Sequence, residues 1–300
     1  MSSIAIASAE TLSSPPPDLQ GEAELEHLKI SYALRQQPVS VTLDGKTIFL
    51  SSFILVLLIH FLDSCHAEVV IASFPIVLLV HNDYQNFLNL GPGGTPSTFS
   101  GYLRISWFRL WALSDPFAAP KPDPMRLPTS GILRRQRLPY RAGPRPVVAG
   151  IAPQRQLDQH GSRVCYRALR WSMAKLANRS PKMFGTEKSC IEKHGLALFA
   201  RHPVQTNCQG EICHVHDSDH SMHMCLHPDD IKEVLEKGWG QRHPLAWRSR
   251  FLKSPVSPDF VMIYAPRDDE ELQVICNIIE AAIWYTVAEE LEMGICPKSM

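Results

Sequence analysis

The chain has 300 residues, enough for one or two domains with a sizeable hydrophobic core. Thirty basic residues balance thirty acidic ones, so the net charge gives no reason to expect nucleic-acid binding. None of the eight cysteines forms a CxxC pair, which excludes zinc-ribbon and thioredoxin motifs, and we expect them to be mostly reduced thiols facing the cytosol.

The N-terminal part changes character near residue 47. Residues 1–46 are rich in Ser, Pro, Ala and Glu, and we expect them to be disordered. Two apolar runs, 48–62 and 69–80, follow within 47–81, which we interpret as a hydrophobic membrane anchor. Asp63 and Glu68 separate the runs. Three arrangements are therefore possible: one span through the first run, one span through the second run, or a re-entrant pair. A secretory signal and a buried soluble helix are the alternatives.

The residues after the anchor are expected to connect it to a domain. Residues 82–115 form a juxtamembrane segment, in which 99–111 is an interfacial or a docking helix. Residues 116–160 hold many prolines and arginines, which predicts a poorly packed linker or a contact with anionic lipid. Counting positive charges near the span favours a single-pass membrane protein with its C-terminal part in the cytosol.

Residues 161–290 have the pattern of a globular α+β domain, followed by a tail at 291–300. We expect a small, mainly antiparallel sheet with helices on one face. Helices are predicted at 163–178, from Pro228 to Gly238 and from 268 onward. Strands are predicted at 189–192, 196–200, 211–217, 222–227 and 261–264.

Six of the thirteen histidines lie between residues 211 and 246, mostly in one predicted hairpin. In the first strand Ile212, His214 and His216 point to one side. If His216 pairs with Ser221, His214 opposes His223 and three histidines share a face. A loop one residue longer would turn His223 to the other face. We favour the first register because it makes the opposite face apolar; that face would hold Cys213, Val215, Met222, Met224 and Leu226.

Three imidazoles on one face can bind zinc, iron or copper, or act as acid and base without a metal. The HxH spacing is a weak metal signal and lacks the carboxylate of an iron facial triad, so we do not favour a metal. His220 at the turn and His227 before a helix are interpreted as structural.

Residues 238–244, GWGQRHP, form a second group of candidate site residues. Trp239 offers a stacking surface, and Arg242 can pair with an enolate or a carboxylate. The alternative is a helix C-cap followed by a core tryptophan.

These motifs resemble the fungal luciferase family, whose members carry a luciferase-like domain and an N-terminal hydrophobic segment. The resemblance runs from about residue 82 to 288 and is most specific at 232–246. The matching stretches are DYQNFL at 83–88, GP at 91–92, FSGY at 99–102, HVHD at 214–217, His223, EVLEKGWGQRHPLA at 233–246 and YAPR at 264–267.

The resemblance implies an oxygen-dependent oxidation of a small molecule, a hydroxylated styryl-pyrone of the hispidin type. Molecular oxygen is the co-substrate, no flavin, nicotinamide or other cofactor is needed, and an unstable peroxide loses carbon dioxide and emits light. Such chemistry needs a base, an oxyanion partner and a pocket that excludes water. We assign the base to His214 or His216 with His223 in support, the oxyanion site to Arg242 and His243, and the pocket wall to Trp239 and Tyr264.

The sequence alone is therefore consistent with two functional hypotheses. One is a membrane-anchored oxidase or oxygenase of a pyrone or related phenolic, with light emission left open. The other is a non-enzymatic, membrane-tethered module that binds a small molecule or a metal.

Overall fold

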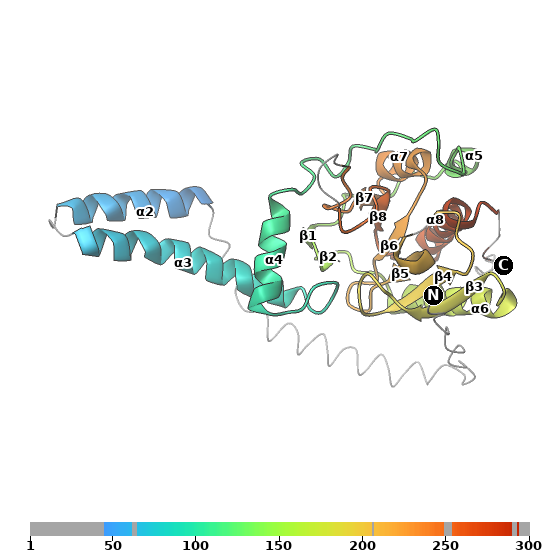
Figure 1. Ribbon diagram of the computed structural model, residues 1–300, viewed down its shortest axis with the longest axis horizontal. Helices are drawn as coiled ribbons and strands as arrows, with labels where there is room; N and C mark the ends of the chain where they lie inside the picture. Colours follow the sequence, from blue (N-terminus) through green and yellow to red (C-terminus); the bar gives the residue numbers. More distant parts are fainter. Residues whose placement is uncertain (1–44, 62–64, 206, 249–253, 290–292, 294–300) are drawn as a thin grey trace. The chain divides into compact units, whose positions relative to one another are not determined.

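The computed structural model describes residues 45–61, 65–205, 207–248, 254–289 and 293 (Figure 1). These residues divide into two compact units, one ending at Asn86 and one beginning at Phe87. The predicted disorder of 1–46 and the predicted tail at 291–300 fall almost entirely outside the described residues.

The first unit consists of α2 (Gly45–His60) and most of α3 (Cys65–Asn89). Within the described residues, no helix is both long and apolar enough to cross a membrane. The prediction of a membrane-spanning helix is therefore not supported. Helix α2 has 16 residues, fewer than the roughly 20 that a span needs, and α3 contains Pro75 and, near its C-terminal end, the polar run HNDYQN.

The second unit is built on a six-stranded antiparallel sheet with the order β3-β4-β5-β6-β8-β7 (Figure 1). The hairpin β5–β6 occupies its centre, so both of its edges pair with neighbouring strands, β4 and β8. The strands are β3 (Phe184–Lys188), β4 (Leu196–Ala200), β5 (Glu211–Val215), β6 (Met222–Cys225), β7 (Gly240–Arg242) and β8 (Phe260–Ile263).

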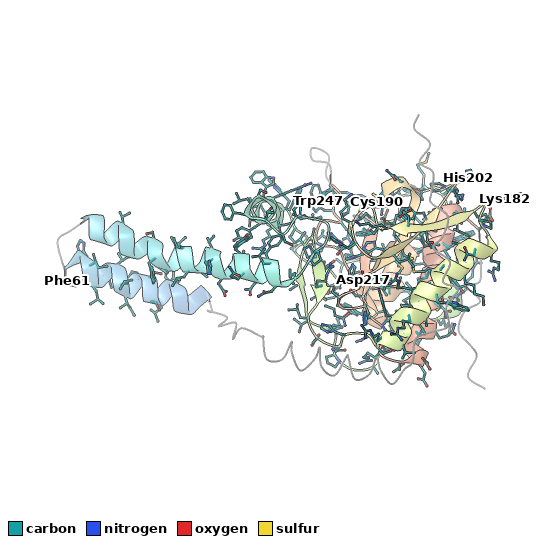
Figure 2. The ribbon with its side chains drawn as sticks, turned by 90° about the horizontal axis from the view of Figure 1, so that it is seen from below. Phe61, Lys182, Cys190, His202, Asp217 and Trp247 are labelled. Atoms are coloured by element: carbon teal, nitrogen blue, oxygen red, sulfur yellow. A yellow bond between two sulfur atoms is a disulfide. The ribbon has the colours of Figure 1, made fainter. Side chains whose placement is uncertain are left out.

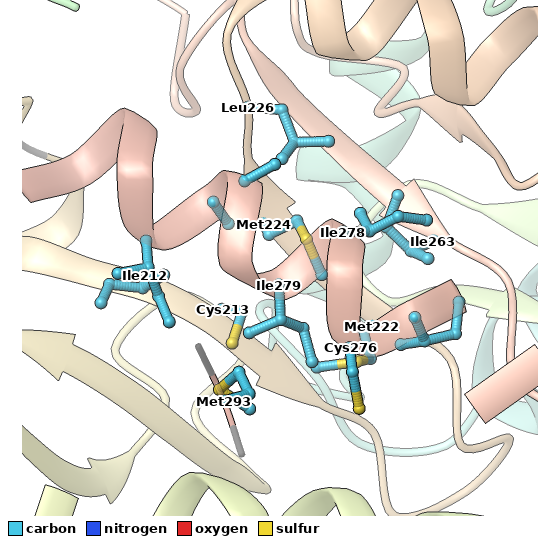
Figure 3. Close-up of a cluster of buried hydrophobic side chains, with 14 of the residues drawn as sticks. Ile212, Cys213, Met222, Met224, Leu226, Ile263, Cys276, Ile278, Ile279 and Met293 are labelled. Atoms are coloured by element: carbon cyan, nitrogen blue, oxygen red, sulfur yellow. The ribbon is translucent and has the colours of Figure 1, made fainter. Parts of the chain in front are cut away.

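Helices α6 (Arg163–Arg179) and α8 (Asp269–Val287) pack on one face of this sheet and form the main core with it. Figure 3 shows Met222 and Met224 of the hairpin beside Ile278 and Ile279 of α8. The predicted α+β class, with helices against an antiparallel sheet, is confirmed for this unit.

Helix α7 (Pro228–Lys237) follows its sequence signals closely. The ring of His227 accepts a hydrogen bond from the backbone N–H of Asp229 at 3.1 Å and caps the helix. Gly238 ends the helix with φ at +83°, a left-handed conformation that glycine adopts without strain. The structural interpretation of His227 is thereby confirmed.

One predicted strand is wrong. Residues 189–192 form a turn, and the partner of β4 is instead β3, five residues earlier. In this turn the hydroxyl of Ser189 and the backbone N–H of Cys190 donate to the carboxylate of Glu211, so the Cys190 N–H is unavailable for a strand ladder.

The expectation of a poorly packed linker at 116–160 is also incorrect. This stretch carries α5 (Leu133–Gln136), β1 (Val148–Gly150) and β2 (Gln154–Gln156), and all three residues of β2 are buried. Some of its arginines donate to the domain: Arg145 donates to the backbone carbonyls of Leu235 and Gly240, and Arg126 donates to the carboxylate of Asp259. A basic composition therefore does not prevent packing here.

Cys190, labelled in Figure 2, forms a disulfide with Cys208. The expectation of reduced thiols is wrong for this pair. It holds for four buried free cysteines, which are Cys165, Cys213, Cys225 and Cys276.

Candidate functional site

The hairpin β5–β6 adopts the register that brings three histidines to one face. His214 pairs with His223, and the backbone N–H of His216 donates to the carbonyl of Ser221 at 2.9 Å. The opposite face enters the main hydrophobic core, as predicted; it carries Cys213, Val215, Met222, Met224 and Leu226.

A β-bulge adds an acidic residue to the histidine face. Between β4 and β5, Leu198 pairs with Cys213 but Phe199 pairs with Glu211, so Ile212 is the extra residue. The bulge turns Ile212 into the hydrophobic core, against the expected alternation, and Glu211 toward His214. The Nδ1 atom of His214 lies 2.5 Å from the Glu211 Oε1 atom.

Each of the three buried histidines uses one ring nitrogen toward an oxygen atom outside the cluster. His214 uses Nδ1 toward Glu211, as described. His216 Nδ1 lies 3.2 Å from Asp219 Oδ1 and 2.9 Å from the Ser221 hydroxyl. His223 Nε2 lies 2.9 Å from the amide oxygen of Gln154.

The remaining ring nitrogens converge. His216 Nε2 lies 3.0 Å from His223 Nδ1. The Nε2 atom of His214 is buried and has no hydrogen-bond partner in the described part of the chain. One nitrogen from each ring lies within 4.8 Å of the other two.

The two carboxylates behind the histidines are held ionised. Burial by itself would raise the pKa of Glu211, but the adjoining His214 and the donors of Ser189 and Cys190 lower it overall. Burial by itself would also raise the pKa of Asp219. Hydrogen bonds from His216 and from the backbone N–H of Gln156 outweigh this effect and bring the pKa of Asp219 well below its ordinary range.

Two of the rings, those of His216 and His223, favour the neutral form. Burial lowers the pKa of His216, although Asp219 counteracts this, and it lowers the pKa of His223 further with help from the neighbouring rings. Near pH 7 neither ring carries a net charge, so each offers one unprotonated nitrogen.

A cavity of about 380 Å³ lies beside the cluster. Of the three histidines only His223 lines it, and the ring of His223 stacks on Phe260 at a centroid distance of 5.1 Å. A larger cavity of about 650 Å³ is lined by none of the three. The other lining residues of the smaller cavity include Arg104, Ile105, Phe108, Ile151, Gln154, Ile191, Lys193, His243 and Leu245.

His243 is a fixed part of the cavity wall. Its Nε2–H donates to the carbonyl of Ile151 at 2.9 Å, and its Nδ1 accepts from the N–H of Leu245 at 3.1 Å. Burial lowers the pKa of His243 to about 4, so the ring is neutral and both of its nitrogens are engaged. It therefore does not supply the positive charge expected for an oxyanion site.

Arg242, Trp239 and Tyr264 line neither the 380 Å³ cavity nor the 650 Å³ cavity. The Arg242 guanidinium donates to backbone carbonyls, including that of Ala118 at 3.2 Å. The Trp239 indole N–H donates to the Pro139 carbonyl at 2.7 Å. Trp239 and Arg242 thus connect loops to the sheet, and the expected roles in oxyanion and substrate binding stay predictions.

His220 is outside the cluster. Its Nδ1 atom lies 2.6 Å from the carbonyl oxygen of Gly161, and its ring stacks on Tyr166 at 4.5 Å. These contacts join the hairpin turn to the start of α6, which agrees with the expected structural role.

The sequence analysis did not assign several residues of the site. Asp219 and Glu211 are close to the histidines in sequence, so a search for carboxylates three residues away would have found them. Gln154 comes from a stretch interpreted as a linker, and Phe260 from the next strand of the sheet. Only the folded chain brings those two to the hairpin.

Known proteins resemble this chain across most of its length. A family model described as Luciferase domain matches residues 209–282, which include the hairpin, α7 and β7. The luciferase of Armillaria mellea is 33% identical over 235 residues, covering 72% of this chain and 85% of the relative. The luciferase of Neonothopanus nambi is 34% identical over 238 residues, with the same coverage. No solved structure matches the chain. The chain belongs to the fungal luciferase family.

Proposed function

We propose that the protein is an oxygen-dependent oxidase or oxygenase of a hydroxylated hispidin-type pyrone or a related phenolic. The substrate occupies the 380 Å³ cavity, and the three-histidine cluster is the reactive centre at its wall. The observation that carries the proposal is the contact of the cluster with the cavity through His223, in the segment that the family model covers.

The size and lining of the cavity support a flat aromatic substrate. Small-molecule sites measure about 300–1,000 Å³ and are mostly apolar with a few placed polar groups. Here Ile105, Phe108 and Phe260 supply apolar surface, while His223 and Gln154 supply polar atoms. An aromatic ring can stack beside Phe260, next to the histidine centre.

The charge of the cavity suits an anionic form of such a substrate. Arg104 and Lys193 line it, and they replace Arg242 as the cations that can hold an enolate oxygen. Loss of a hydroxyl proton makes the pyrone electron-rich enough to react with oxygen. The relatives named luciferase make peroxide formation, loss of carbon dioxide and light emission the outcome to test.

The decisive experiment measures oxygen uptake and photon emission by the full-length protein with a hydroxylated hispidin-type pyrone. We expect uptake by the wild type, loss of uptake in His223→Ala, and no change in His194→Ala, a control at an exposed histidine. Light with uptake identifies a working luciferase, and dark uptake that needs His223 identifies an oxygenase with a dark product. No uptake by folded wild type contradicts the proposal and favours a binding module.

A second variant tests whether this cavity is the substrate site. Ile191 is half-buried in the cavity wall and makes no hydrogen bond to the histidines. Ile191→Trp should fill the space and raise KM by about 10-fold or more, with less effect on kcat, because it removes binding without touching the reactive centre. Ile191→Leu is the matched control, and equal KM values for all three proteins would place the substrate elsewhere.

A further inference from the structure

We infer that His214, His216 and His223 bind one divalent ion of a first-row transition metal. The inference departs from the sequence expectation, which did not favour a metal. It rests on the arrangement of the ring nitrogens and their partners, and it does not depend on the proposed function.

The oxygen atoms around the cluster show which nitrogen of each ring carries a hydrogen. The Nδ1 atoms of His214 and His216 face carboxylates, and Nε2 of His223 faces an amide oxygen, all at 2.5–3.2 Å. Because these oxygens only accept hydrogen bonds, each of the three nitrogens carries the hydrogen. Metal-binding histidines are oriented in this way, by donating the other N–H to a carboxylate or carbonyl group.

The inner nitrogens are then left with lone pairs that point at one another. His216 Nε2 and His223 Nδ1 are 3.0 Å apart, and two lone pairs at that distance repel. The His214 Nε2 atom is fully buried and has no partner among the described residues. A single cation between the three nitrogens satisfies all of them at once, and a buried polar atom without a partner otherwise costs free energy.

The surroundings of the cluster favour a cation. The buried carboxyl groups of Glu211 and Asp219 lie against the outer nitrogens of His214 and His216. A cation among the inner nitrogens would lie close to both carboxyl groups, and a buried carboxylate is stabilised by a nearby opposite charge. The nearby Arg155 is already paired with Glu192.

The donor set selects the class of metal. Imidazole nitrogens suit zinc, copper, iron and nickel, while magnesium and calcium prefer oxygen ligands. Three protein ligands also leave a coordination position for a further molecule, as in catalytic zinc sites. A second group of possible ligands, Cys190, Cys208 and Glu211, is a weaker candidate because its two sulfurs are bonded to each other.

The test measures metal in the full-length protein without any substrate. Elemental analysis after purification, and after loading with Co²⁺ and desalting, should find one ion per chain, and bound Co²⁺ should show the visible absorption of nitrogen coordination. His214→Ala should lose both signals, and the exposed control His194→Ala should keep them. Folded wild type that retains no zinc, iron, copper, nickel or cobalt would overturn the inference.

A thermal measurement covers the case in which His214→Ala folds poorly. Chelator-treated wild type should gain thermal stability when Zn²⁺ or Co²⁺ is added, because a ligand that binds only the folded state stabilises it. Glu211→Gln, which keeps all three histidines, should need about 10–100-fold more metal for the same gain. Equal unfolding temperatures with and without metal would count against the site.

The two proposals can fail separately. Metal binding without oxygen uptake would leave this inference standing and contradict the oxidase. Oxygen uptake by folded protein that retains no metal after loading would support the oxidase and overturn the metal inference.

Discussion

The two faces of the β5–β6 hairpin differ in the chemistry of the side chains that they bury. One face carries Met222 and Met224 into the core under α8, and the other carries three histidines backed by two carboxylates. Both faces are buried, but the first is stabilised by removal of apolar surface from water and the second by hydrogen bonds between polar groups. Burial therefore does not distinguish core from site here; the chemistry of the partners does.

Carboxyl groups show the same contrast. On the histidine face, neighbouring rings and N–H donors hold the pKa of Glu211 and Asp219 low in spite of burial. On α7, burial raises the pKa of Asp230 to about 6, although the backbone N–H groups of Leu133 and Ile132 donate to it. A buried carboxyl group stays acidic only where cationic or strongly donating partners surround it.

The largest effect is expected from the apolar face. Met224→Ala should lower the free energy of unfolding by about 2–5 kcal/mol, because it leaves a cavity between β6 and α8. Urea unfolding measures this value. The metal content and oxygen uptake per folded molecule should not change, because Met224 faces away from the histidines.

Met224→Leu is the matched control, with an expected cost of less than about 1.5 kcal/mol because the volume is nearly conserved. If Met224→Ala retained full stability but lost metal, the separation of the two faces would be wrong.

A pH-dependent effect is expected at Asp230. Its folded pKa of about 6 exceeds the unfolded value of 3.8, so the folded state binds the proton more tightly. The associated stability is complete below pH 3.8 and is lost as the pH rises through about 6. The loss corresponds to roughly 2–3 kcal/mol.

The variant Asp230→Asn isolates this effect because it does not titrate. The stability of wild type minus that of Asp230→Asn, from urea unfolding, should be larger at pH 4 than at pH 7. The same difference at both pH values would show that the carboxyl group is not desolvated under α5.

The smallest and most specific effect is expected from Glu211→Gln. The amide keeps the size of the side chain but removes the charge that orients His214 Nδ1–H. Retention of metal should weaken by about 10–100-fold, that is roughly 1.4–2.7 kcal/mol, while the sheet remains intact by circular dichroism. Unchanged metal affinity would mean that Glu211 serves the turn at Ser189 and Cys190 alone.

Several elements were predictable because their signals are local. The caps of α7 at His227 and Gly238, and the alternation within the hairpin, depend on neighbouring residues. The register of the hairpin was also predictable, because only one pairing makes a continuous apolar face. The strand at 189–192 was wrong because a turn and a strand compete for the same N–H groups, and the distant Glu211 decided between them.

The roles within the site were less predictable. The motif at 238–244 pointed to Trp239 and Arg242 as ligand-binding residues, but a sequence motif does not reveal which side chains face a cavity. Their polar atoms are used by backbone carbonyls of Pro139 and Ala118, which come from the stretch interpreted as a linker. Composition described that stretch correctly as basic and proline-rich, yet it did not show that Arg126 and Arg145 donate to acceptors on the domain.

The sequence by itself determined the family, the α+β class and the three histidines on one face, because these depend on short-range patterns and on residue identity. Only the tertiary structure decided that Gln154 meets His223, that a bulge turns Glu211 toward His214, and that the cavity opens at His223. The physical reason is that these contacts join segments distant in sequence or depend on one extra residue in a strand. Their free energy comes from the packing of the whole domain, which no local pattern records.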